Sequence, residues 1–375
     1  MGQAGPIAVY GATGYTGKLV ARELARRELD FVLSGRSASK LRALASDIGG
    51  DPPVRPASLD DRDALRHVLG DCAAVINCAG PFMRYGEPVV RAAVETGTHY
   101  VDTTGEQPFM QFIYERLDDA AKAAEVAVVP AVGFDYLPGD LISALASRGL
   151  EPLSEIVIAY AAQDFAATRG TLHSGLEMLR SGGLEYRDGS LRRVGWRPRR
   201  VHFTFPEPIG RRAMIPYPSG EILTVPRHTR TRNVVTLINA GVAAPPGMPD
   251  DLVPLTQPAL ALALHTPAKA LADLAIDRLP EGPSEEQRRA ARFTIVVMAR
   301  GEDGRTGRGL VRGGDVYGLT AVTAVHSAVM VADAGYDRAG ALSPASAFEP
   351  VEFLNYLGDH GVTFELDGVA EEAAV

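Results

Sequence analysis

The chain has 375 residues, of which 46% are hydrophobic and 22% charged, and its net charge at pH 7 is −8. These values are ordinary for a globular protein with a large core, and the length allows two domains of about 150 residues or more each. The negative net charge argues against nucleic acid as a partner. The chain has only two cysteines, Cys72 and Cys78, which argues against a disulfide scaffold or a bound metal.

The sequence contains no segment that would direct the chain into a membrane. The N-terminus runs directly into a predicted strand, without a basic segment followed by an apolar run. The longest uncharged stretch, Leu252 to Ala268, is interrupted by three prolines and is too short to span a bilayer. We therefore expect a cytoplasmic protein without a transmembrane segment.

A buried strand, a tight turn and the first turn of a helix are predicted for residues 5–17, Gly-Pro-Ile-Ala-Val-Tyr-Gly-Ala-Thr-Gly-Tyr-Thr-Gly. Gly11 permits the turn, Gly14 lets a pyrophosphate approach the backbone, and Gly17 lets the helix pack against the sheet. The alternative is a purely structural glycine turn. The flanking strand and helix favour a nucleotide cradle, whose predicted contacts are Gly11, Thr13, Gly14, Tyr15, Thr16 and Gly17.

Strands and helices alternate over the first 140 residues. Further strands are predicted at 31–34, near 54, and at 73–77, 100–102 and 126–129. Helices are predicted at 41–48, from Pro88, at 109–124, and after Ser58, which is expected to be an N-cap. Six apolar strands separated by helices predict an α/β fold with a Rossmann-type doubly wound parallel sheet. Ligands in such sheets bind where the first and fourth strands end, which adds these predicted cofactor contacts: Asn77, Cys78, Ala79, Gly80 and Pro81.

The end of the second strand selects the cofactor. Proteins that bind NAD place an acid about 20 residues after the glycines, where it holds the ribose 2′-hydroxyl. This chain instead has Ser34, Gly35, Arg36 and Ser37, followed by Lys40. A guanidinium, a hydroxyl and an ammonium group suit a 2′-phosphate, so we predict NADP(H). The alternative is that Arg36 is a solvated loop residue and that Ser37 caps the next helix.

Six short runs carry a family resemblance: 11–17 (GATGYTG), 34–37 (SGRS), 80–88 (GPFMRYGEP), 100–106 (YVDTTGE), 133–140 (GFDYLPGD) and 317–320 (YGLT). Together they resemble the saccharopine dehydrogenase-like oxidoreductases, and most closely the trans-acting enoyl reductase branch. The resemblance implies an NADP-binding domain, a second domain that covers the nicotinamide, and hydride transfer to an unsaturated substrate. In this branch the substrate is often tethered to a carrier protein or to coenzyme A. Two alternatives remain, a C–N oxidoreductase of the lysine-pathway type and a sensor that binds NADP without turnover.

The ends of the later strands supply further candidates. Tyr85, beside Arg84, is a candidate proton donor near the nicotinamide, or else a ring packed on its loop. After the fifth strand, Gly105 and Glu106 are predicted cofactor or substrate contacts, although Glu106 also suits a helix N-terminus. After the sixth strand, Phe134 is predicted to cover the nicotinamide, and Asp135 is either an acid or a capping residue.

His173 is a third catalytic candidate, in a different part of the chain. It lies in the run 169–174 at the start of a predicted helix, where an anion can bind and an imidazole can donate a proton. The alternative is that Thr171 caps the helix and His173 is a surface residue.

A second, α+β domain is predicted from residue 141 to 314. Its expected strands lie at 156–160, 201–205, 214–217, 222–225 and 234–238, with a hairpin between 293–298 and 309–311 across Asp303-Gly304. The apolar helix predicted at 316–332 is expected to return to the first domain. We therefore predict three segments: residues 1–140, 141–314, and 315–375 packing back on the first domain.

The second domain contains a basic segment. Eleven arginines and three acids lie between Arg187 and Arg232, which gives a local charge of +8 in an acidic chain. A field of this size can steer an acidic carrier protein or a phosphopantetheine arm toward the domain. The alternative is that these arginines are solvated surface residues without a partner protein or substrate.

Overall fold

The computed structural model describes residues 5–194, 201–244 and 247–367. The chain forms two compact units, of which one comprises Met1–Leu137 and Tyr317–Phe348 and the other Pro138–Val316 and Glu349–Val375. We call them the first and the second unit and describe each by itself.

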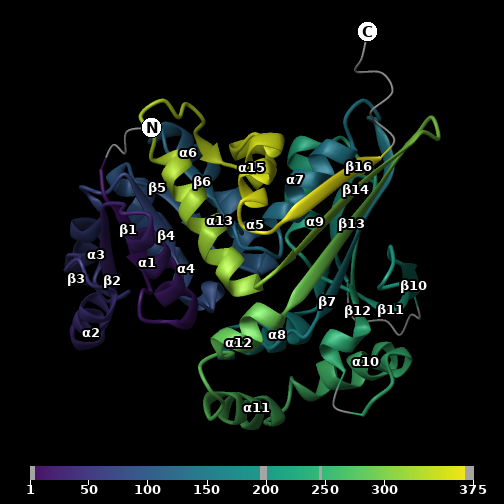
Figure 1. The fold of residues 1–375 in the computed structure, drawn as a ribbon, viewed down its shortest axis with the longest axis horizontal. Helices are drawn as coiled ribbons and strands as arrows, with labels where there is room; N and C mark the ends of the chain where they lie inside the picture. Colours follow the sequence, from purple (N-terminus) through teal and green to yellow (C-terminus); the bar gives the residue numbers. More distant parts are fainter. Residues whose placement is uncertain (1–4, 195–200, 245–246, 368–375) are drawn as a thin grey trace. The chain divides into compact units, whose positions relative to one another are not determined.

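The first unit is built on a parallel seven-stranded sheet in the order β15-β6-β5-β4-β1-β2-β3, with helices along its faces (Figure 1). The strands are β1 (Ile7–Tyr10), β2 (Phe31–Gly35), β3 (Val54–Pro56), β4 (Ala74–Asn77), β5 (His99–Asp102), β6 (Ala127–Val129) and β15 (Gly340–Ala341). Every residue of β1, β2 and β4 is buried, as expected for strands covered on both faces. The predicted doubly wound fold is therefore confirmed, with β15 as a seventh strand that had not been predicted.

The helices of this unit follow its strands in alternation. They are α1 (Tyr15–Arg26), α2 (Ala38–Ile48), α3 (Arg62–Leu69), α4 (Phe82–Thr96), α5 (Gln107–Arg116), α6 (Asp118–Ala123), most of α13 (Val316–Val331) and α14 (Pro344–Ala347). Helix α7 (Leu137–Ala146) leads from the first unit into the second.

Three predicted helix boundaries are wrong. Asp61 rather than Ser58 is the N-cap of α3, because its side chain accepts the N–H of Ala64. Helix α4 begins at Phe82 rather than at Pro88. The helix predicted at 109–124 is two helices, α5 and α6, separated at Leu117.

The second unit contains a nine-stranded mixed sheet, whose continuous order is β10-β11-β12-β7-β13-β14-β16 and to which β8 and β9 attach beside β12. Its strands are β7 (Leu153–Gln163), β8 (Gly183–Arg187), β9 (Ser190–Val194), β10 (Val201–Thr204), β11 (Arg211–Pro216), β12 (Val234–Asn239), β13 (Arg292–Gly301), β14 (Thr306–Gly314) and β16 (Thr363–Asp367). Strands β7 and β12 are parallel, whereas β13 and β14 form the predicted antiparallel hairpin. The predicted α+β character of this part of the chain is confirmed.

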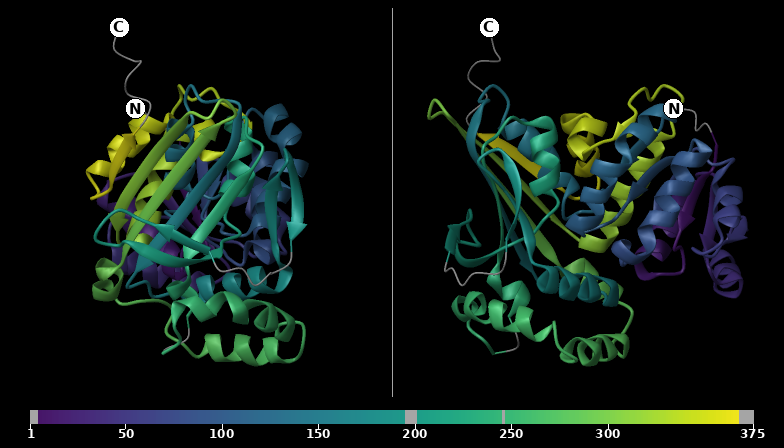
Figure 2. Two further views of the ribbon diagram at one scale, coloured as in Figure 1. Left: turned by 90° about the vertical axis from the view of Figure 1, so that its right-hand side faces the viewer. Right: turned by 180° about the vertical axis from the view of Figure 1, so that it is seen from behind.

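Helices of the second unit accompany this sheet. They are α8 (Arg169–Ser181), α9 (Glu221–His228), α10 (Val253–Ala263), α11 (Ala268–Asp277), α12 (Glu285–Ala290) and α15 (Pro350–Gly358), with short 3-10 turns at Ala240–Ala243 (η1) and Asp250–Leu252 (η2). Figure 2 shows α10 and α11, in green, beyond one end of the long strands.

Two predictions for this part of the chain need correction. Residues 222–225, predicted as a strand, lie in α9, because a short apolar run fits a buried helix as well as a buried strand. The segment 315–375 does not pack on the first unit as a whole: residues from Glu349 onward belong to the second unit. There β16 pairs with β14 from Arg308–Asp367 to Arg312–Thr363, which completes an edge of the large sheet.

Among the described residues no single helix is long and apolar enough to cross a membrane. Helices α10 and α11 reach the required length and hydropathy only as a pair, which is bent by 105°.

Candidate functional site: a dinucleotide cradle at the carboxyl edge of the first sheet

The glycine turn between β1 and α1 leaves no room for side chains. Gly11 has a φ of +77°, and a Cβ atom there would lie 2.9 Å from the backbone nitrogen of Ala79. A Cβ on Gly17 would collide with the carbonyl oxygen of Gly11. Gly14 is the N-cap of α1, and no side chain caps the helix at this end. The turn therefore fits a pyrophosphate at a helix N-terminus, as predicted from its spacing.

The end of β2 holds this turn in place. The carbonyl oxygen of Ser34 accepts the N–H groups of Gly11 and Ala12 at 3.1 and 3.2 Å. Ser37 caps α2 by accepting the N–H of Lys40, so the capping alternative for Ser37 is observed. Arg36 is exposed and forms no hydrogen bond or ion pair with the part of the chain that the structure describes. Its guanidinium is therefore available for an anion, and contact with a 2′-phosphate stays a prediction.

A buried polar network links the ends of β4 and β5 to the loop after β6. The side-chain amide of Asn77 donates to the Tyr100 hydroxyl at 3.0 Å, which donates to the Asp102 carboxylate at 2.8 Å. Asp102 also accepts the N–H groups of Thr104 and Ala131, each at 2.9 Å. Burial raises the pKa of Asp102 to about 6. We had predicted Asn77 as a cofactor contact, but its amide belongs to this network; Tyr100 and Asp102 had not been recognised as its partners.

Glu106 ties the loop after β5 to the start of α4. Its two carboxylate oxygens accept the N–H groups of Phe82 and Met83 at 2.9 and 3.0 Å, and the residue is 2% exposed. A carboxylate at this position satisfies two backbone donors and interacts favourably with the helix dipole. Glu106 thus acts at the terminus of α4 and not, as the alternative had it, at the start of the helix that follows it, α5. Its contact with the cofactor or substrate stays a prediction.

Two of the predicted catalytic residues lie in these loops. Tyr85 is half-buried in the first turn of α4, and the Arg84 guanidinium carbon lies 5.5 Å from the centre of its ring. Asp135 follows β6, and burial raises the pKa of its carboxyl group to about 6. Gly133 makes room for it, since a Cβ atom there would lie 2.8 Å from a carboxylate oxygen of Asp135. Catalytic roles for Tyr85 and Asp135 stay predictions.

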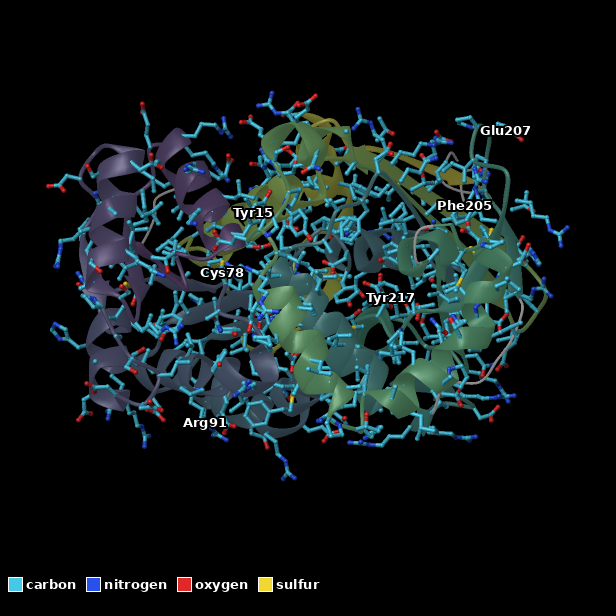
Figure 3. The ribbon with its side chains drawn as sticks, turned by 90° about the horizontal axis from the view of Figure 1, so that it is seen from below. Tyr15, Cys78, Arg91, Phe205, Glu207 and Tyr217 are labelled. Carbon is cyan, nitrogen blue, oxygen red and sulfur yellow. The ribbon has the colours of Figure 1, made fainter. Side chains whose placement is uncertain are left out.

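Helix α13 returns from the far end of the chain to this edge. The ring of Tyr317 packs edge-to-face on Tyr15, with centroids 5.4 Å apart, and Thr320 accepts the N–H of Phe134 at 3.2 Å. Figure 3 labels Tyr15, at the start of α1, and Cys78, directly after β4. The only signal in the sequence for these contacts was the run 317–320.

Cys78, which we predicted as a cofactor contact, is a free cysteine. Burial raises the pKa of its thiol to about 12. The thiol is therefore protonated at neutral pH, which disfavours a nucleophilic role, and contact with the cofactor stays a prediction.

His173 lies in the second unit and bridges two helices. Its ring nitrogens lie 3.2 Å from Asp273 and 3.0 Å from Asp277, both on α11, while His173 itself is on α8. Thr168, rather than Thr171, is the N-cap of α8. A catalytic role for His173 stays a prediction, but both of its nitrogens already have partners.

The basic segment is distributed over several elements of the second unit. Arg192 lies 3.4 Å from Asp188, and Arg232 lies 2.5 Å from Glu302. Three of the arginines, Arg197, Arg199 and Arg200, lie outside the described residues. Docking of a carrier protein on this segment stays a prediction.

A buried polar cluster in the second unit was missed by the sequence reasoning. The Tyr160 hydroxyl on β7 hydrogen-bonds the carboxylate of Glu221 at the start of α9, and both side chains are buried. Beside it, His228 and Asp140 form a pair at 2.9 Å. Burial, assisted by the nearby Asp140, raises the pKa of Glu221 to about 8. A single glutamate in an apolar run gives no signal that tertiary structure will bury it.

No group of three or more side chains within the described ranges could hold a metal ion. Comparison with known proteins finds a family model that is similar to part of the first unit. Residues 7–129 match the model of the saccharopine dehydrogenase NADP binding domain. The chain is also 36% identical over 146 residues to a lipid droplet localized protein of Caenorhabditis elegans, and 37% identical over 140 residues to a trans-acting enoyl reductase of Mycobacterium leprae (strain TN).

Both matches cover 36% of this chain and 34% of the relative, so the chain matches about a third of the length of these proteins. A solved saccharopine dehydrogenase (L-Glu forming) from Saccharomyces cerevisiae shares the fold, with a TM-score of 0.63 at 16% identity over 96% of this chain and 99% of that one. The predicted resemblance and the NADP(H) cofactor are thereby confirmed for residues 7–129, which match the NADP binding domain of saccharopine dehydrogenase.

Proposed function

We propose that this protein is an NADPH-dependent reductase of an activated carbon–carbon double bond, such as an enoyl thioester or an enone. The observation that carries the proposal is the junction of the loops after β4, β5 and β6. Glu106 fixes the first turn of α4, which contains Tyr85, and Gly133 makes room for Asp135. Two candidate proton donors therefore lie at the same sheet edge as the cradle. The match to a trans-acting enoyl reductase supports this class of substrate.

In this proposal the cradle binds the dinucleotide through backbone groups. The first turn of α1 faces the pyrophosphate, while Arg36, Ser37 and Lys40 bind the 2′-phosphate. The bound NADPH supplies the hydride. Thr320, by accepting the N–H of Phe134, holds the backbone that places the Phe134 ring over the nicotinamide.

Asp135 is the group that we assign to proton delivery. Reduction of a C=C bond requires a proton at the carbon next to the carbonyl once the hydride has been added. A carboxyl group with a pKa of about 6 is partly protonated at neutral pH, which suits a general acid. Tyr85 then orients the substrate carbonyl, and His173 has no part because its nitrogens are engaged by α11.

The substrate is proposed to be tethered to coenzyme A or to a carrier protein, which the basic segment would attract from a cytoplasmic pool. The second candidate reaction is oxidoreduction of a C–N bond, favoured by the match to the saccharopine dehydrogenase domain family. A sensor that binds NADP without turnover is the third.

The deciding experiment is NADPH oxidation by the purified chain with three substrate classes: enoyl-coenzyme A thioesters, free enones and cyclic imines. Turnover of enoyl-coenzyme A thioesters, with or without turnover of free enones, supports the proposal. Turnover of imines alone selects the C–N reaction, and tight NADPH binding without any turnover selects the sensor.

The variants Asp135→Asn and Tyr85→Phe assign the roles. We expect Asp135→Asn to lower kcat by about 100-fold or more and to remove the decline in kcat/KM between about pH 6 and 8. Tyr85→Phe should mainly raise KM. Asp164→Asn is the control, because this aspartate is exposed and lies in the second unit. If Asp135→Asn keeps the activity and the pH profile of the unmodified chain, Asp135 is not the acid.

A further inference from the structure

Helices α10 and α11 expose an unusual concentration of leucines. Of the eleven exposed large hydrophobic side chains among the described residues, seven lie between residues 252 and 279, and we call them the leucine surface: Leu252, Leu255, Leu260, Leu262, Leu271, Leu274 and Leu279. Leu262 is 71% exposed and Leu271 is 69% exposed. Single exposed leucines need no explanation, but a concentration of this kind in a soluble domain indicates a binding surface.

The leucines point outward because other residues fix the inner faces of the two helices. Val253 and Gln257, four residues apart, form the buried face of α10, whereas Leu255 and Leu262, seven residues apart, share the opposite face. The sequence contains no acid, lysine or arginine from residue 252 to 268. Helix α10 is therefore apolar on its outer as well as on its inner face.

The charges of α11 are turned away from the leucines and toward α8. His173 contacts Asp273 and Asp277, and Lys269 lies 2.9 Å from Glu177 and 2.7 Å from Asp273. These pairs neutralise the polar side of α11 and hold it against α8. Leu271 and Leu274, three residues apart, are left on the outside.

Cations border the leucine surface. Arg211 and Arg212 at the start of β11 are exposed, as is Arg278 between Leu274 and Leu279. The side chains of these three arginines form no hydrogen bond or ion pair with residues that the structure describes. Ala213, two residues after Arg211, packs in one core cluster with Val253 of α10, so this end of β11 adjoins the helix.

Among the described residues, most acids of the same region have partners, the exception being the exposed Asp250. Asp251, just before α10, lies 3.0 Å from His202, and the acids of α11 contact His173 and Lys269 as described above. Three arginines against Asp250 leave a net positive charge beside the leucines. This charge favours an anionic apolar partner over a second copy that would present the same arginines.

We propose that α10 and α11 bind the surface of a bilayer that contains anionic lipids. The leucines enter the boundary between headgroups and acyl chains, and Arg211, Arg212 and Arg278 contact the phosphates. Neither helix is long enough to span, and the bend of 105° between them suits a pair that lies along a surface. The leucine surface takes no part in the proposed reduction, whereas Arg211 and Arg212 also belong to the basic segment that is proposed to attract the substrate.

Vesicle flotation of the full chain tests the proposal, with phosphatidylcholine vesicles that contain either none or about 30% of phosphatidylglycerol. We expect binding to the anionic vesicles and about tenfold weaker binding to the neutral ones. The double substitution Leu262→Ser with Leu271→Ser should weaken binding to anionic vesicles by at least about tenfold, because two leucine side chains no longer leave water. Arg211→Glu with Arg278→Glu should abolish the preference for phosphatidylglycerol.

Leu191→Ser is the matched control, because Leu191 is 38% exposed but lies on β9 outside the leucine surface. All variants are compared by thermal unfolding and by NADPH affinity, which should not change. The proposal is overturned if the unmodified chain does not float, or if the double leucine variant floats as well as the control. It is also overturned if the unmodified chain is a dimer that does not float and the double leucine variant is a monomer. In that case a second copy of the chain would occupy the leucine surface.

Discussion

Arg36 is the residue on which the choice between NADPH and NADH depends in our account. It stands at the end of β2 without a partner in the described chain, where an acid would repel a 2′-phosphate. We expect Arg36→Ala to weaken NADPH binding by about 10- to 100-fold, the loss of one or two charge-assisted hydrogen bonds, and to leave NADH affinity unchanged. Titration of the two reduced cofactors measures both.

Arg42→Ala is the matched control, since Arg42 is also exposed but lies further along α2. Equal losses for NADPH and NADH in Arg36→Ala would contradict a role in recognising the 2′-phosphate.

Glu221 makes the stability of the second unit depend on pH. Its pKa is about 8 in the folded chain, against a usual value of 4.5, chiefly because it is buried. Between these pH values the folded state binds more protons than the unfolded state, so the free energy of unfolding falls as pH rises. The contribution is fully present below about pH 4.5 and lost above about pH 8, and it amounts to something on the order of 4 kcal/mol.

Glu221→Gln should remove this slope, because a neutral amide replaces the titrating carboxyl group. Urea denaturation at several pH values between about 5 and 9 measures it. The exposed residue Glu207, labelled in Figure 3, provides the control variant Glu207→Gln. A slope in Glu221→Gln equal to that of the unmodified chain would show that other groups cause the pH dependence.

At the level of elements, α4 depends on a residue from another loop. Glu106 accepts two N–H groups of the first turn of α4, so Glu106→Ala leaves two donors without a carboxylate. We expect a loss of about 2 kcal/mol in the free energy of unfolding, as for a hydrogen bond to a charged group. Glu106→Gln should lose less, because its amide oxygen still accepts one bond.

Glu115→Ala is the control variant, because Glu115 on α5 is exposed and its carboxylate accepts a hydrogen bond from the side chain of Gln111 on the same helix. If the two alanine variants unfold at the same urea concentration, the carboxylate of Glu106 does not hold α4 in place.

At the level of the whole molecule, the first unit is completed by residues that lie 186 or more positions further on. Strand β15 pairs with β6, Thr320 accepts the N–H of Phe134, and Tyr317 packs on Tyr15. We expect a chain that ends at Leu137 to be less stable and to bind NADPH at least about tenfold more weakly, because the neighbours of the cradle and of β6 are lost. Isothermal titration with NADPH and thermal unfolding measure both effects.

Joining residues 317–348 to that shorter chain through a flexible glycine-serine linker should restore binding. If the chain ending at Leu137 binds NADPH as tightly as the full chain, the return of α13 does not contribute to the site.

The sequence by itself determined the doubly wound fold of residues 7–129 and the class of cofactor. The spacing of Gly11, Gly14 and Gly17 constrains the backbone locally, and the alternation of buried strands and helices is a periodic signal that neighbouring residues carry. Both could therefore be predicted without knowing what packs against them. The replacement of an acid by Arg36 likewise belongs to a single loop.

Only the tertiary structure decided which polar groups meet. Glu106 stands 24 residues from Phe82, and Tyr160 stands 61 residues from Glu221. Their pairing depends on the order of strands and on the direction of each side chain, which a local pattern does not encode. The same reason explains why α9 was predicted as a strand and why β16 was assigned to the first unit: burial and pairing at those positions come from the large sheet, whose neighbours are remote in sequence.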